Sequence, residues 1–141
     1  MAASERADPV PPCVARLSVA SGGVTTTESY LYAYFTTGAN SGKLQSVTLR
    51  RSTDGGSTWG AVRSAEYTYY DGSYAGEHAR GNLGDLRTVT IRDAAGAVLD
   101  RKMYWYYVPS DGEADGYAGA LKYTFSPEAD ARLAASLPVG G

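Results

Sequence analysis

Few residues of this chain have the types and spacing that chemistry requires. His78 is the only histidine. A nucleophile–base pair would need it beside a serine or cysteine and oriented by a carboxylate. Glu77 is adjacent, but no Gly-x-Ser-x-Gly motif occurs, and one histidine with the single cysteine Cys13 gives neither a zinc motif nor an internal disulfide. We therefore expect an exposed loop histidine, no catalytic residue and no enzyme.

Acidic residues gather in glycine-rich segments. Asp111, Glu113 and Asp115 precede Gly116 at the spacing that opens an EF-hand loop. Position 12 of that loop would be Lys122, where a bidentate glutamate is required, so we expect a solvated loop, with weak calcium binding as the alternative. We predict no metal and no cofactor. A glycosidase pair would need a cleft, whereas the other candidate acids lie in turns or beside glycine: Asp71, Glu77, Asp85 and Asp93.

Aromatic residues are the third group of candidates. Twelve tyrosines stand against two phenylalanines and two tryptophans. Their faces suit the CH groups of a sugar, but tyrosines in strands also form cross-strand ladders on one sheet face, which is the interpretation we favour. Trp105 lies between Tyr104 and Tyr106 and therefore faces the opposite side of a strand. We expect it to be exposed, and it is the candidate aromatic for contact with a ligand.

A repeat positions these aromatic residues. Tyr-x-Tyr pairs recur three times at an interval of 37 residues, and a further tyrosine extends the second and third copies where the first has Ala33. Because this register follows the repeat and not a pocket, it favours a structural role. The predicted repeat anchors are Tyr30, Tyr32, Tyr67, Tyr69, Tyr70, Asp71, Tyr104, Tyr106 and Tyr107.

Each tyrosine cluster is followed by a polar loop, a Gly-x-Leu step and an alternating run. The steps lie at 42–44, 84–86 and 119–121, and the runs 44–50 and 86–92 align closely. Alternation at a period of two predicts strands. Turn signals at Asp54-Gly55-Gly56 and at 93–96 predict hairpin connections, and Ser21-Gly22-Gly23 predicts one more between 14–19 and 24–34.

The two ends of the chain differ from this pattern. Residues 1–13 carry charges and prolines where a signal peptide needs an apolar run, so we expect no signal peptide in this chain and predict that this segment is disordered. Ser126, Pro127 and Glu128 predict the start of a helix over 126–138. A net charge of −2 without a basic block gives no attraction for nucleic acid, and no segment is apolar enough to span a membrane.

These elements predict an all-β fold, a meander of antiparallel β-hairpin repeats with one short C-terminal helix. The hairpin domain covers 14–125, with repeats at about 30–66, 67–103 and 104–125. We expect an exposed strand edge that pairs with neighbouring repeats of a longer chain or with a second copy.

The second repeat resembles the RHS-repeat, or YD-repeat, family. The resemblance rests on Tyr67-Thr-Tyr-Tyr-Asp-Gly72, then Gly81-Asn82-Leu83 and the strand from Leu86, and covers residues 24–125. It implies a structural segment of a large bacterial protein, extracellular or envelope-associated, whose hairpins coil into a shell. Carbohydrate association is proposed for some members of that family. A carbohydrate-binding module using Trp105, Tyr107 and loop acids is therefore our alternative.

A second resemblance is local. The segment Ser52-Thr-Asp-Gly-Gly-Ser-Thr-Trp59 is similar to the Asp-box of sialidases and related propellers, with Ser52, Asp54, Gly56, Thr58 and Trp59 at its defining positions. In such a box the aspartate accepts bonds from turn amides, and the tryptophan packs beneath the turn. One box predicts a hairpin over 52–59. A fragment of an Asp-box hydrolase is the second alternative.

Overall fold

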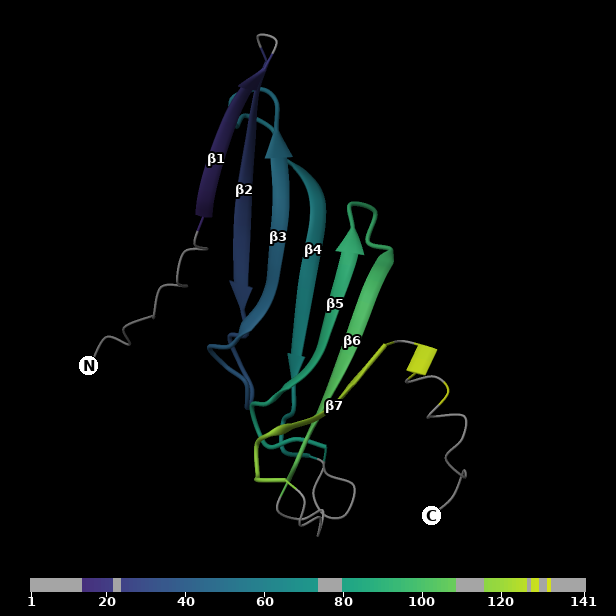
Figure 1. Ribbon diagram of the computed structural model, residues 1–141. Coiled ribbons are helices and arrows are strands. Elements are labelled where there is room, and N and C mark those ends of the chain that lie inside the picture. Colours follow the sequence, from purple (N-terminus) through teal and green to yellow (C-terminus); the bar gives the residue numbers. More distant parts are fainter. Residues whose placement is uncertain are drawn as a thin grey trace, which may run out of the picture.

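A computed structural model of the chain describes residues 14–21, 24–73, 80–108, 116–126, 128–129 and 132. Seven antiparallel strands form one sheet in sequence order, each paired with its neighbour along the chain (Figure 1). The predicted all-β meander is confirmed. The strands are β1 (Val14–Ser21), β2 (Val24–Tyr34), β3 (Leu44–Ser52), β4 (Gly60–Tyr69), β5 (Leu86–Asp93), β6 (Val98–Tyr106) and β7 (Leu121–Phe125).

The chain ends are described only in part. The predicted disordered segment 1–13 lies outside the described residues. Of the predicted helix, Glu128, Ala129 and Arg132 are helical, and the Ala129 N–H donates to Ser126 Oγ over 3.3 Å. This bond is the N-cap that the serine predicts.

Turns at one end of the sheet close the hairpins. Ser21 pairs with Val24 across the first predicted turn, whose residues 22–23 lie outside the described part. Asp93 closes the turn between β5 and β6, because its Oδ1 accepts the N–H groups of Ala95 and Ala97, 2.9 Å each. The hairpins predicted at 52–59 and 93–96 are confirmed.

A β-bulge recurs at the opposite end of the sheet. The register shifts where Tyr34, Tyr69 and Tyr106 pair with Leu44, Leu86 and Leu121, which leaves one extra residue on the odd-numbered strand each time. The three equivalent tyrosines are thus separated by 35 and then 37 positions. The predicted repeat register, which made Tyr32 the equivalent of Tyr69 and Tyr106, is therefore wrong for the first copy by two residues.

The tyrosines do not form the predicted tyrosine ladders. On one face of the sheet, Tyr30 pairs with Leu49, Tyr32 with Val47 and Tyr67 with Val89. The tyrosine clusters lie on even-numbered strands and an odd-numbered strand separates each pair, so aliphatic residues stand opposite the rings. Aromatic–aliphatic cross-strand pairs of this kind stabilise antiparallel sheets.

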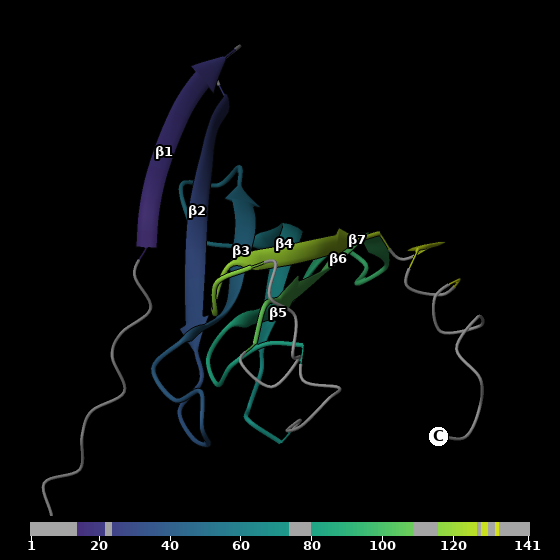
Figure 2. The same cartoon turned by 60° about the horizontal axis from the view of Figure 1, so that its bottom comes forward.

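The strands form a single twisted layer. Figure 2 shows β7 running across the direction of β1 and β2, as the accumulated twist of a sheet requires. The described strands have no second layer, and the Tyr70 ring is covered by Gly81 of its own connection and by Tyr106. Among the residues whose burial is described, the buried hydrophobic ones are Tyr70 and Val108, and the buried polar ones are Thr27, Ser29, Ser52, Thr88 and Thr90.

Candidate functional site

The Asp-box-like turn is held by its own side chains. Asp54 Oδ1 accepts the N–H groups of Ser57 and Thr58 at 3.0 and 2.9 Å, and its Oδ2 accepts the Thr58 hydroxyl at 2.5 Å. Ser52 Oγ donates to Asp54 Oδ1 and accepts the Gly56 N–H. Trp59 Nε1 donates to the Gly56 carbonyl over 3.0 Å. All five predicted positions therefore act together in one turn.

These hydrogen bonds hold Asp54 in its charged form. The bond from the Ser52 hydroxyl, then those from the Thr58 hydroxyl and amide, hold the pKa of Asp54 well below its usual range. Both carboxylate oxygens are occupied by the turn. A general acid at neutral pH needs a raised pKa, so this aspartate is built to brace a hairpin.

The other predicted acids also brace turns where the structure describes them. Asp71 Oδ1 accepts the Ser73 N–H, and Asp85 Oδ2 accepts the Asn82 N–H at 2.7 Å. The bonds from Ser73 lower the pKa of Asp71. Glu77, His78 and the EF-hand-like acids at 111–115 lie outside the described residues. In the described part, no three His, Cys, Asp or Glu side chains gather as metal ligands would, and no helix is long and apolar enough to cross a membrane.

The repeat is most exact in the three connections at the bulged end. In each, the residue after the strand exchanges two backbone hydrogen bonds with the residues before the next strand: Phe35 with 42–43, Tyr70 with 84–85 and Tyr107 with 119–120. A turn precedes each strand, with a glycine of positive φ (84°, 88° and 86°) at its third position. This is the type II position that glycine fills without strain. The predicted Gly-x-Leu steps are these turns.

In two of these connections, an aromatic ring packs directly against a second glycine. A Cβ on Gly81 would lie 2.4 Å from the Tyr70 ring, and one on Gly116 would lie 2.5 Å from the Tyr107 ring. Only glycine allows such an approach. The first connection has Phe35 and Ala39 at the equivalent positions. The role of Gly116 was not visible in the sequence, because the loops differ in length.

Contacts then couple each connection to the next repeat. Asn40 Nδ2 donates to the Tyr70 carbonyl over 3.2 Å, and the Phe35 ring meets the Tyr69 ring edge-on at 6.2 Å. One repeat later the Tyr70 hydroxyl donates to the Tyr104 carbonyl over 2.9 Å, and its ring meets Tyr106 edge-on at 6.5 Å. Burial raises the pKa of Tyr70 to about 12. The edge-on ring contact between successive repeats thus recurs, while the hydrogen bond that accompanies it differs from one repeat to the next.

Trp105 is less exposed than predicted. It lies on the face opposite Tyr104, as expected, but Phe125 packs on it at 4.6 Å, Tyr123 at 6.3 Å, and the Arg80 guanidinium lies 4.4 Å above its ring. The indole is half-buried, whereas Tyr123 and Tyr117 have exposed fractions of 52% and 82%. The alternation of residues along the strand correctly predicted the sheet face on which Trp105 lies. It did not predict the two aromatic side chains of β7 that pack against the indole.

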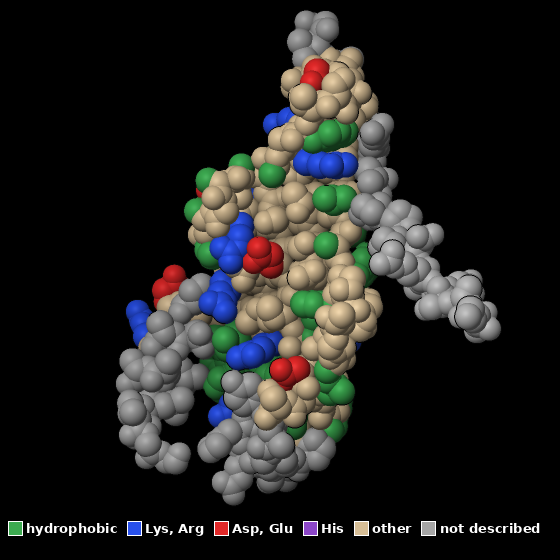
Figure 3. All heavy atoms as spheres, turned by 180° about the vertical axis from the view of Figure 1, so that it is seen from behind, with side chains coloured by type: hydrophobic (Ala, Val, Ile, Leu, Met, Phe, Trp, Pro, Cys, Tyr) green, Lys and Arg blue, Asp and Glu red, His purple; other side chains and the backbone are tan. Residues whose placement is uncertain are grey.

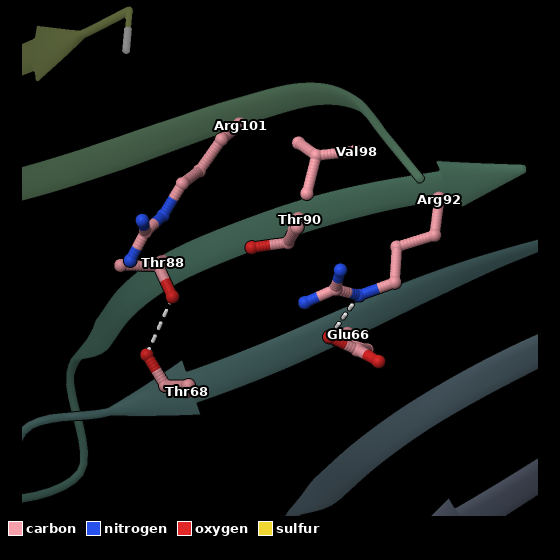
Figure 4. Close-up of a pocket in the computed structure, with 7 residues that line it drawn as sticks. All are labelled: Glu66, Thr68, Thr88, Thr90, Arg92, Val98 and Arg101. Carbon is pink, nitrogen blue, oxygen red and sulfur yellow. Dashed lines mark hydrogen bonds and ion pairs between the residues drawn. The ribbon is translucent and has the colours of Figure 1, made fainter. Parts of the chain in front are cut away.

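A groove of about 380 Å³ lies on the same sheet face as Trp105, over β4, β5 and β6. Its floor is formed by threonines and its walls by longer side chains: Glu66, Thr68, Thr88, Thr90, Arg92, Val98 and Arg101 (Figure 4). Seen from behind, charged side chains stand among broad areas of other side chains and backbone, without a large hydrophobic patch (Figure 3). This groove was not predicted from the sequence, where its one signal is the polar alternation of Thr88, Thr90 and Arg92.

Comparison with known proteins gives no relative. No protein-family model, curated protein or solved structure matches the chain significantly.

Proposed function

We propose that this chain is a structural segment of a repeat protein of the RHS or YD class, extracellular or envelope-associated, without catalysis of its own. One observation carries the proposal. The same backbone connection recurs three times along the sheet, and the same edge-on ring contact with the next repeat recurs twice, from Phe35 to Tyr69 and from Tyr70 to Tyr106. Proteins built this way gain stability from each neighbour interface.

Duplication of one repeat tests this proposal. Tyr107 is the equivalent of Tyr70, so residues 70–106 form one complete unit. A second copy of this unit, inserted between Tyr106 and Tyr107, should join the sheet and raise the free energy of unfolding, because it adds one more interface. Chemical denaturation and circular dichroism measure the change.

A matched insert provides the control. The same 37-residue copy carrying Gly81→Val cannot seat its tyrosine ring and should give no added stability. A duplicated chain that unfolds in two separate transitions, or is less stable than the parent, would contradict the structural proposal.

The partners in this proposal are neighbouring repeats. The outer strands β1 and β7 each pair on one side only. On β7, Leu121 and Tyr123 are more than half exposed. Unpaired strand edges invite pairing with another chain, so we expect concentration-dependent association in light scattering. A clean monomer at millimolar concentration would count against it.

A carbohydrate-binding module is the second candidate. It is favoured by the aromatic cluster of Trp105, Tyr123 and Phe125 on the face that carries the groove. Binding to a glycan array that disappears in Trp105→Ala and persists in Tyr117→Ala would support this candidate. If the parent chain binds no glycan on the array, the carbohydrate-binding candidate is rejected.

A further inference from the structure

The groove on the polar face contains unused hydrogen-bonding groups. Thr90 is 92% buried, since its exposed fraction is 8%, and no group in the described part of the chain bonds to its hydroxyl. Thr88 beside it is different, because its hydroxyl shares a 2.6 Å bond with Thr68. The Thr90 oxygen itself still meets solvent, since among the described residues the buried side-chain atom without a hydrogen-bond partner is Asn40 Oδ1. The Thr90 hydroxyl opens into the groove and is available to a ligand.

Two guanidinium groups flank this hydroxyl. Figure 4 shows the Thr90 oxygen directed between the ends of Arg92 and Arg101. Arg92 is held in place, because its Nε donates to Glu66 at 2.8 Å and its Nη1 to the Gly96 carbonyl at 3.0 Å. Its Nη2 makes no bond to any described residue, and neither does the Arg101 side chain. One fixed and one adjustable guanidinium thus face the same space.

The charges of the groove leave an excess of one positive charge. Arg92 is neutralised by Glu66, and Arg101 has no acidic partner in the described part of the chain. Guanidinium groups bind carboxylate and sulfate oxygens through paired N–H donors. A hydroxyl between two such groups supplies the third donor for an oxyanion.

The ligand also has to suit the rest of the groove. The backbones of β4, β5 and β6 each pair with a neighbouring strand on both sides, so an extended peptide would find no strand edge here. The Glu66 carboxylate has an oxygen left over as an acceptor for sugar hydroxyls. We propose that this groove binds an acidic saccharide, with its carboxylate or sulfate group between Arg92 and Arg101 and on the Thr90 hydroxyl.

This inference narrows the second candidate function from carbohydrates in general to acidic ones, and it moves the contact from Trp105 to the groove. One experiment distinguishes the candidate function from the groove proposal. Neutral-glycan binding that depends on Trp105 alone would support the candidate function and overturn the groove proposal.

The test is titration calorimetry of the whole chain with a short oligogalacturonide, a sulfated dextran oligomer, neutral dextran and poly-glutamate. We expect binding of one or both acidic saccharides, weakened by salt. The first two arms identify carboxylate or sulfate as the bound group. Equal binding of poly-glutamate, or no binding of either acidic saccharide at millimolar concentration, would overturn the proposal.

Variants locate the binding in the groove. Arg101→Gln should weaken it about tenfold, because a charge-assisted bond is lost from an exposed residue whose change leaves the fold intact. Thr90→Val keeps the shape and should weaken binding by about threefold. Lys102→Gln removes the same charge from the opposite face of β6 and should leave affinity unchanged. Equal losses in Arg101→Gln and Lys102→Gln would overturn the proposal.

Discussion

The two ends of the sheet connect their strands in different ways. At one end, the turn over 52–59 is satisfied by its own residues, chiefly by the Asp54 carboxylate and the Ser52 hydroxyl. At the other end, the connection after β4 extends to the third repeat, because the Tyr70 hydroxyl bonds to Tyr104 and the Arg80 carbonyl accepts the Tyr106 N–H.

This difference separates local folding from cohesion between repeats. A self-sufficient turn can form whenever its own strands meet, and its loss affects one hairpin. A connection that binds the next repeat transmits any damage along the chain. We therefore expect substitutions at the bulged end to destabilise two repeats and substitutions at the Asp-box end to destabilise one.

The largest effect is expected for Gly81→Ala. The added Cβ would lie 2.4 Å from the Tyr70 ring, and such overpacking costs about 3 kcal/mol. Hydrogen exchange should accelerate in β6 as well as in the 70–85 connection. Gly60→Ala is the control, because its nearest atom is 4.0 Å away. Equal unfolding free energies for the two variants would show that the ring does not need this glycine.

Tyr70→Phe should have the next largest effect. It removes the bond to the Tyr104 carbonyl and costs about 1 kcal/mol. Tyr30→Phe, at an exposed tyrosine, should cost less.

The same tyrosine predicts a pH dependence. Burial raises its pKa from 10.0 to about 12 in the folded chain. Its contribution to stability is therefore complete below pH 10 and is lost as the pH rises from 10 to 12. The difference in unfolding free energy between the parent and Tyr70→Phe should shrink over that range. A difference that stays constant would contradict a buried, neutral phenol.

Asp54→Asn tests the self-sufficient turn. At neutral pH it should lower the melting temperature by a few degrees and speed exchange only at the amides of 54–59, because the charged acceptor is lost. The pKa of Asp54 is lowered on folding, so its contribution is present above its usual value of 3.8 and declines as the pH falls below it. The parent and variant should therefore converge in acid. Faster exchange in β5 or β6 would refute the local character of this turn.

The smallest effect is expected at the ion pair between Arg51 and Glu28, which joins β2 to β3 over 2.6 Å with a half-exposed arginine. A double-mutant cycle with Glu28→Gln and Arg51→Gln should give about 0.5 kcal/mol, decreasing with salt. A coupling above the loss measured for Tyr70→Phe would mean that charge pairs, and not the aromatic connections, hold the repeats together.

The sequence predicted local features well. Alternation located the strands, and Asp54-Gly55-Gly56 located a turn whose side-chain bonds follow from its residue types. The prediction of equivalent residues in the three repeats failed, because it used the spacing of the tyrosines alone. Tyr30 and Tyr32 fit an interval of 37, yet the bulge fixes Tyr34 as the equivalent of Tyr69.

The groove could not be predicted for a related reason. Thr90 and Arg101 are directly opposite each other across β5 and β6, but that pairing depends on a register that the bulge between Ile91 and Arg92 also shifts. Neighbours across strands are set by such irregularities, which leave no mark in residue type.

The order of the strands has a mechanical consequence. Since β1 and β7 are the opposite edges of a single-layer meander, tension between them loads one strand pair after another. Such a sheet would unzip hairpin by hairpin at low force and would re-form in the same steps when released. The cross-repeat tyrosine bonds then set the force at which each step yields, which makes the chain extensible in stages.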